Sequence, residues 1–137
     1  MTYLDELQPG MTAETAKTIT EADILMYAAV STDTNPVHID AEAAAKTPFG
    51  QRIAHGMLSA GLISAVLGTK LPGPGTIYLG QTMRFRAPVK IGDTVTAKVE
   101  VTAVDMAKKR ATLKTECFVA GNVVIEGEAV VMPPTRA

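Results

Sequence analysis

GMLSAGLISAVLGTK, residues 56–70, is the stretch of the chain that decides the fold. Drawn as a helix, it places methionine, leucine, isoleucine and valine on several sides of the axis, with small residues between them. A helix that is apolar on nearly all sides is buried in the protein interior. The segment ends at LPGPG, residues 71–75, because proline and glycine do not continue a helix. The sequence therefore predicts a buried helix over residues 56–70, roughly 22 Å long at 1.5 Å per residue.

The hydrophobic period changes from helical to two after this helix. Three runs alternate apolar and polar residues, at 77–86, 94–102 and 111–119, and a last run covers 123–132. Residues typical of hairpin turns lie between successive runs, for example Gly92-Asp93 before residue 94 and Gly121-Asn122 before residue 123. One-faced alternation joined by short turns indicates an antiparallel sheet. We therefore expect an α+β fold in which a curved antiparallel sheet wraps its apolar face around the long central helix.

The N-terminal third of the chain has its own boundary signals. Residues 11–19 suit a leading strand. Thr20 and Asp23 have the spacing of a capping box, which predicts a helix that ends just before Asp33. A second short helix is expected over residues 40–46, with its first residue as the N-cap.

Length, charge and cysteine content narrow the class of protein. A chain of 137 residues is expected to form one domain over residues 1–137. A net charge of −1 gives no broad field to hold nucleic acid or an anionic membrane. Residues 1–7 do not form a signal peptide, and no apolar run is long enough to span a membrane. The single cysteine, Cys117, offers neither a disulfide nor a metal cluster and is expected to be buried, so the cytosol is the expected compartment.

The chain has two histidines, and one of them closes the segment DTNPVH, residues 33–38. Proline restrains the backbone of this segment at its own position and at the residue before it. The carboxylate of Asp33 and the imidazole of His38 can then share one water molecule and move its proton. In the alternative interpretation, Asp33 caps a turn and His38 is a core histidine with satisfied hydrogen bonds. The residues alone leave both interpretations open.

A second group of candidate site residues lies at and near the start of the buried helix. If Gly56 is its first residue, the unpaired N–H groups there suit an oxyanion, and a ligand can approach because glycine has no Cβ. The alternative is that Gly56 only permits close packing of helix on sheet. His55 either holds the turn, which we favour, or contacts substrate. The hydroxyl of Ser64 either bonds to a backbone carbonyl one turn earlier or faces the pocket.

Other catalytic chemistry lacks its sequence signature. There is no nucleophile elbow of the form G-x-S-x-G, so we expect no serine nucleophile. The two histidines do not come at metal-ligand spacing with a cysteine or clustered acids, so we expect no metal site.

Five segments of the chain, taken in order, resemble the signature of one enzyme family. They are YAAVSTDTNPVHID (27–40), AHGML (54–58), LPGPG (71–75), YLGQ (78–81) and FRAPV (85–89). The family is that of the MaoC-like, (R)-specific enoyl-CoA hydratases, and the likeness is closest to the short bacterial members that supply polyhydroxyalkanoate synthesis. The chain departs from the pattern at Thr32, where many members carry glycine.

The resemblance implies a hot-dog fold, a homodimer and an acyl-CoA thioester substrate, with no cofactor beyond the coenzyme A of the substrate. It implies that Asp33 and His38 activate water for syn addition to a trans-2-enoyl-CoA, giving (3R)-hydroxyacyl-CoA. It also implies that the N–H of Gly56 receives the thioester oxygen. Further positions matching family site residues are Ser64 near the pair, Asn35 against substrate, and Leu67 and Val130 lining the acyl pocket. Because Leu67 and Val130 are bulky, short acyl chains are expected.

Three rival functions fit the same fold. A hot-dog thioesterase would attack the carbonyl carbon instead of C3. An acyl-carrier-protein dehydratase would need basic residues at the tunnel mouth, where Arg84, Arg86 and Lys90 are available, although these also suit the phosphates of coenzyme A. A non-enzymatic acyl-binding or dimerisation module would have an inactive site.

Overall fold

The protein was analysed as a computed structural model that describes residues 1–136. The expected domain, residues 1–137, thus includes one residue outside the described part. Its elements are η1 (Leu4–Glu6), β1 (Thr12–Thr18), α1 (Glu21–Ser31), α2 (Pro36–Ile39), α3 (Ala41–Ala45), α4 (Gly56–Thr69), β2 (Ile77–Phe85), β3 (Thr94–Asp105), β4 (Arg110–Val119) and β5 (Asn122–Met132). The predicted central helix and all five predicted strands are confirmed, with bounds that differ by a few residues.

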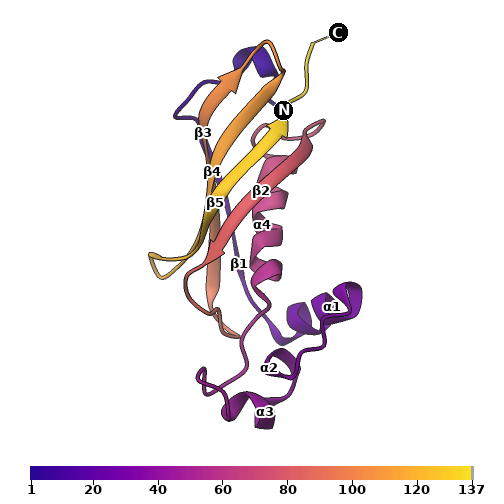
Figure 1. Ribbon diagram of the computed structural model, residues 1–137, viewed down its shortest axis with the longest axis vertical. Coiled ribbons are helices and arrows are strands. Elements are labelled where there is room, and N and C mark those ends of the chain that lie inside the picture. Colours follow the sequence, from indigo (N-terminus) through magenta and orange to yellow (C-terminus); the bar gives the residue numbers. More distant parts are fainter. Residues whose placement is uncertain (137) are drawn as a thin grey trace.

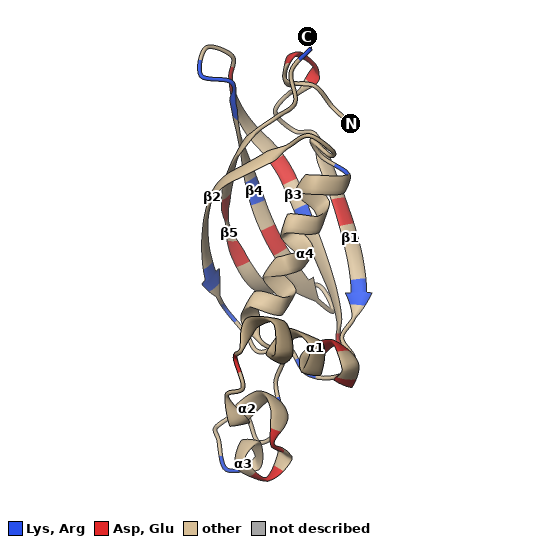
Figure 2. Ribbon diagram, turned by 90° about the vertical axis from the view of Figure 1, so that its right-hand side faces the viewer, with Lys and Arg blue, Asp and Glu red and all other residues tan. Residues whose placement is uncertain are grey.

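The strands form one antiparallel sheet in the order β1-β3-β4-β5-β2. The sheet is curved, α4 lies in its hollow, and β1 and β2 form its two edges (Figure 2). The three short helices α1, α2 and α3 gather beyond one end of the sheet, beside the start of α4 (Figure 1). This is the predicted α+β, hot-dog arrangement.

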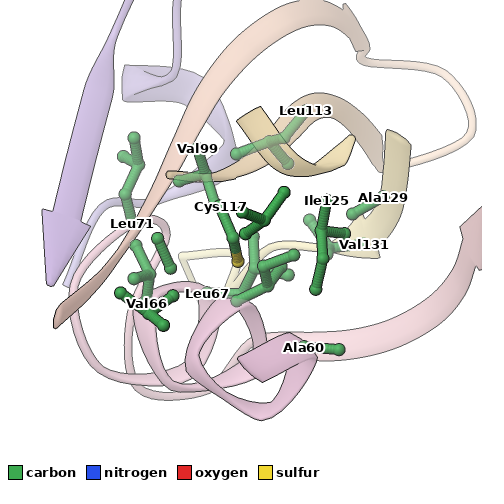
Figure 3. Packing of buried hydrophobic residues seen from close by; sticks show 14 of the residues in the cluster. Ala60, Val66, Leu67, Leu71, Val99, Leu113, Cys117, Ile125, Ala129 and Val131 are labelled. Carbon is green, nitrogen blue, oxygen red and sulfur yellow. The ribbon is translucent and has the colours of Figure 1, made fainter. Parts of the chain in front are cut away.

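The core lies between α4 and the inner face of the sheet. Alternate residues of β3 and β4 are buried, as the period of two predicts, and Cys117 is among them with no exposed surface. Figure 3 shows Val66 and Leu67 of α4 pointing toward the inward side chains of the strands, including Ile125. Each such aliphatic side chain contributes about 1.5–3 kcal/mol when fully buried, so α4 is fixed firmly on the sheet.

The capping box predicted before α1 is present. The hydroxyl of Thr20 accepts a hydrogen bond from the N–H of Asp23 at 3.2 Å, and the Asp23 carboxylate accepts one from the N–H of Thr20 at 2.9 Å. The second bond is the main reason that the pKa of Asp23 lies below its ordinary value. The helix ends at Thr32, whose φ of 64° is left-handed and turns the chain toward Asp33. This is the position where many members of the resembled family carry glycine.

Candidate active site

The segment DTNPVH folds through hydrogen bonds between its own side chains and backbone. The carboxylate of Asp33 accepts from the N–H of Asn35 at 3.2 Å, and the Asn35 side chain accepts from the N–H of Val37 at 3.2 Å. Asn35 is thus the N-cap of α2, with Pro36 at the first helical position. These bonds place Asp33 on an exposed turn and His38 on the short helix that follows it.

His38 is held by its backbone surroundings in one tautomer. Its Nδ1 lies 2.7 Å from the carbonyl oxygen of Ile53, and the ring is largely buried. Because a carbonyl oxygen only accepts hydrogen bonds, Nδ1 carries a proton, and in the neutral form of the ring Nε2 is then the acceptor. A neutral imidazole with a free lone pair suits the orientation of a water molecule.

His55 joins the parts of the site. Its side chain is only 2% exposed, and its Nε2 donates to the carbonyl oxygen of Asp33 at 2.9 Å. Its ring stacks on that of His38, with centroids 3.9 Å apart and planes inclined by 29°. The centroid of the Tyr27 ring lies 4.6 Å from that of His55. His55 is the residue before Gly56, so one side chain connects the turn, the imidazole and the start of α4. These contacts support the predicted role of holding the turn.

Gly56 is the first residue of α4, as predicted. The first N–H groups of a 14-residue helix have no partner within it and lie at the positive end of its dipole. A Cβ at Gly56 would lie 2.7 Å from Cδ1 of Phe85, and closer still to Cε1 of that ring. A side chain larger than glycine would therefore displace the aromatic ring beside the helix terminus, in addition to any effect on a ligand.

A cavity of about 450 Å³ brings the main predicted residues together. Asp33, His38 and Gly56 all line it, along with His55 and the ring of Phe85. A carboxylate and an imidazole thus share a cavity with a helix N-terminus, and its volume is large enough for a small acyl group. Such a site can hold a water molecule and polarise a carbonyl group.

The structure does not bring the remaining predicted residues to this cavity. Ser64 is on an exposed side of α4 and does not line it, while Leu67 is 1% exposed and packs in the core under the sheet. Val130, which was predicted to line the acyl pocket, does not line this cavity either. Its neighbours Ala129 and Val131 point to the core (Figure 3), and alternation along β5 therefore places Val130 on the opposite face.

Sequence reasoning missed Ser59. This serine is fully buried on α4, lines the cavity, and its hydroxyl has no hydrogen-bond partner among the described residues. The available signal was its position three residues after Gly56, which places it one helical turn from the expected oxyanion site.

Other binding features of the described chain are few. One ligand atom each from Asp33, His38 and His55 forms a group compact enough for a metal ion. Arg86 also lines the cavity, but its guanidinium pairs with Glu126. Within residues 1–136, none of the helices combines the length and the apolar character needed to cross a membrane.

The chain was compared with known families and proteins. Residues 6–127 match the family model described as MaoC like domain. An (R)-specific enoyl-CoA hydratase of Rhodospirillum rubrum is 58% identical over 98% of this chain and 93% of its own length. A 3-hydroxybutyryl-CoA dehydratase of Methylorubrum extorquens is 49% identical over 98% of this chain and 85% of its own. The solved (R)-hydratase of Aeromonas caviae, described as involved in PHA biosynthesis, is 48% identical over 93% of this chain and 98% of its own, with a TM-score of 0.90.

Proposed function

The chain belongs to the MaoC-like family, and we propose that it is an (R)-specific enoyl-CoA hydratase, which adds water to trans-2-enoyl-CoA and forms (3R)-hydroxyacyl-CoA. The observation that carries the proposal is the shared cavity, which Asp33, His38 and Gly56 line together. A hydratase needs these three components: a base for water, a group that orients the water, and a donor for the thioester oxygen.

The mechanism follows from these positions. The thioester oxygen accepts a hydrogen bond from the N–H of Gly56, which withdraws electron density from C3 of the enoyl group. Water held between Asp33 and Nε2 of His38 attacks C3, and Asp33 takes a proton as the C–O bond forms. The electrons of the C2–C3 double bond move to the thioester oxygen as an enolate. When the enolate collapses, the pair returns a proton to C2 on the same face, so the overall addition is syn.

The tautomer of His38 is consistent with its proposed role of orienting the water while Asp33 takes the proton. With Nδ1–H committed to the carbonyl of Ile53, Nε2 can accept a hydrogen bond from the water but holds no proton to give at the start. In this proposal the carboxylate of Asp33 takes the first proton, and Nε2 of His38 orients the water. The ring of His55 stacks on His38 and its Nε2 bonds to the backbone carbonyl of Asp33, so His55 holds the backbone of Asp33 beside the ring of His38.

The homodimer expected from the family resemblance is also part of this proposal. β2 is an edge strand, and Ile77, Leu79 and Phe85 on it are large apolar residues with about half of their surface exposed. A bare edge with apolar side chains is a surface that proteins usually cover. A second copy would cover it, and light scattering should then give twice the mass of one chain.

Two expectations from the sequence remain predictions. The preference for short acyl chains was based on Leu67 and Val130, and neither lines the cavity. The cytosolic location likewise stays a prediction.

The test is a product analysis with crotonyl-CoA. We expect loss of the enoyl absorbance, a (3R)-hydroxybutyryl-CoA product on a chiral column, and no free thiol with Ellman's reagent. Thiol release would instead identify a thioesterase, and binding without turnover would identify an inactive acyl-binding module. Much faster turnover of a carrier-protein thioester than of the coenzyme A thioester would favour the acyl-carrier-protein dehydratase.

A further inference from the structure

The helix that carries His38 is too short to be stable by itself. α2 consists of the four residues Pro36–Ile39, and an isolated helical turn is unstable in water because few hydrogen bonds offset the ordering of its backbone. The last carbonyl groups of a helix also have no partner within it. The direction of the His38 ring must therefore be set by contacts from outside α2.

Two adjacent residues, Arg52 and Ile53, supply such contacts. The N–H of Ile53 donates to the carbonyl of Val37 at 3.2 Å, and Nε of Arg52 donates to the carbonyl of His38 at 2.6 Å. The carbonyl of Ile53 accepts from Nδ1 of the His38 ring at 2.7 Å. These bonds hold the backbone of α2 and the imidazole against the same short segment of chain.

The guanidinium of Arg52 also connects α2 to α1. Its Nη1 donates to the carboxylate of Glu21, the first residue of α1, at 2.7 Å. The planar guanidinium presents Nε and Nη1 at fixed angles, so one side chain holds both acceptors at once, which the single ammonium group of lysine cannot do. The side chain of Arg52 is 16% exposed and that of Glu21 is 50% exposed. Water therefore screens the ion pair, and the bond to the carbonyl of His38 is the more important of the two.

We propose that Arg52 is a positioning residue, which fixes the imidazole of His38 through the backbone of α2. Arg52 does not line the cavity, so its effect on the reaction passes through His38. The inference rests on the proposed function, because the ring is held in order to orient the attacking water. A displacement of about 1 Å in an active site lowers the rate about 100-fold, so losing the bond is costly although Arg52 does not reach the water.

The kinetic test compares three variants with crotonyl-CoA. Arg52→Met removes both hydrogen bonds and keeps an unbranched side chain. We expect its kcat to fall at least about tenfold while KM stays within about threefold, because His38 acts on water and not on the thioester. Arg52→Lys can donate to only one of the two acceptors, so it should lose at least about threefold in kcat but less than Arg52→Met. Glu21→Gln keeps the Nε bond and should retain at least about half of the parent kcat.

Lys17→Gln is the matched control. Lys17 pairs with Asp23 at 3.0 Å, and Asp23 belongs to the same first turn of α1 as Glu21. This variant also removes an ion pair to that turn, but it leaves both bonds of Arg52 in place. We therefore expect parent-like kcat and KM.

A second measurement does not depend on turnover. The two histidines have opposite tautomers, since His38 donates from Nδ1 and His55 donates from Nε2. Nitrogen NMR spectra of the rings at about pH 9, where imidazole is neutral, distinguish these tautomers. In Arg52→Met we expect the shifts of His38 to move toward those of a tautomer mixture, while those of His55 keep their parent values. The spectrum of His38→Gln assigns the signals.

Specific results would overturn the proposal. They are parent-like kcat in folded Arg52→Met, a raised KM with unchanged kcat, or lost activity with unchanged shifts of His38. Circular dichroism checks folding, and if Arg52→Met fails to fold, Arg52→Lys decides the result by the same criteria. If the parent protein hydrates no enoyl-CoA while the shifts of His38 respond as expected, the positioning of the ring stands and the proposed function fails.

Discussion

Replacing Gly56 with alanine tests the link between the start of α4 and catalysis. The new Cβ would lie 2.7 Å from Cδ1 of Phe85, whereas ordinary contact begins at 3.4 Å, so the ring or the helix terminus must move by at least about 0.7 Å. The ring is 54% exposed, so it can move without unfolding the protein. The movement changes the geometry around the N–H that we assign to the thioester oxygen.

The expected effect is large on the rate and small on stability. A displacement of about 1 Å in an active site, or the loss of one oxyanion donor, lowers the rate about 100-fold, which corresponds to about 2.7 kcal/mol. Alanine in place of glycine within a helix contributes about 0.5–1 kcal/mol, which offsets part of the cost of moving the ring. We therefore expect the free energy of unfolding of Gly56→Ala to stay within about 1 kcal/mol of the parent value.

The assay is steady-state hydration of crotonyl-CoA, with urea unfolding in parallel. Phe85→Ala removes the ring that meets the new Cβ, so the double variant should recover at least tenfold in kcat over Gly56→Ala. Gly68→Ala is the matched control, because a Cβ at that position in the same helix meets nothing within 4 Å. Parent-like kcat in Gly56→Ala, or a double variant no faster than the single one, would refute the reasoning.

Four further predictions concern stability and reactivity. In Gly127→Ala the new Cβ would lie 2.8 Å from a backbone Cα of β2, so we expect about 3 kcal/mol of destabilisation in urea, and a loss below 1 kcal/mol would contradict this. Thr20→Ala should cost about 1 kcal/mol by removing the cap. Because the folded pKa of Asp23 is lowered, its contribution to the free energy of unfolding is complete above the ordinary pKa of 3.8 and is lost as the pH falls through the folded pKa. The urea midpoint of Asp23→Asn should therefore vary less with pH than that of the parent protein below about pH 5. Burial raises the pKa of Cys117 to about 12, so Ellman's reagent at pH 8 should label this thiol only after unfolding.

The elements with strong periodic patterns could be predicted from the sequence. α4 is apolar on nearly all sides, and β4 alternates between buried and less buried residues, so both elements could be located from the pattern of apolar residues. The end of β3 was placed at residue 102 instead of Asp105, because a register shift after Val101 interrupts the alternation. No helix was predicted at α2, since its four residues are too few to show a helical period.

The site was predictable where it depends on neighbouring residues. Asp33 and His38 belong to one rigid segment, so their proximity follows from local geometry. The face that Val130 occupies could not be predicted from the sequence, because a shift of one residue in a strand reverses the face of a side chain. The contacts of His55 with Asp33 and His38 depend on how the chain folds back, and periodicity does not contain that information.

The central claim is that Asp33 and His38 activate one water molecule opposite the amide of Gly56. The most direct measurement is kcat for crotonyl-CoA hydration by Asp33→Asn and His38→Gln, with folding checked by circular dichroism. Each variant should lose at least about 100-fold in kcat, within the range for acid–base groups. Folded variants that hydrate crotonyl-CoA at nearly the parent rate would contradict the claim.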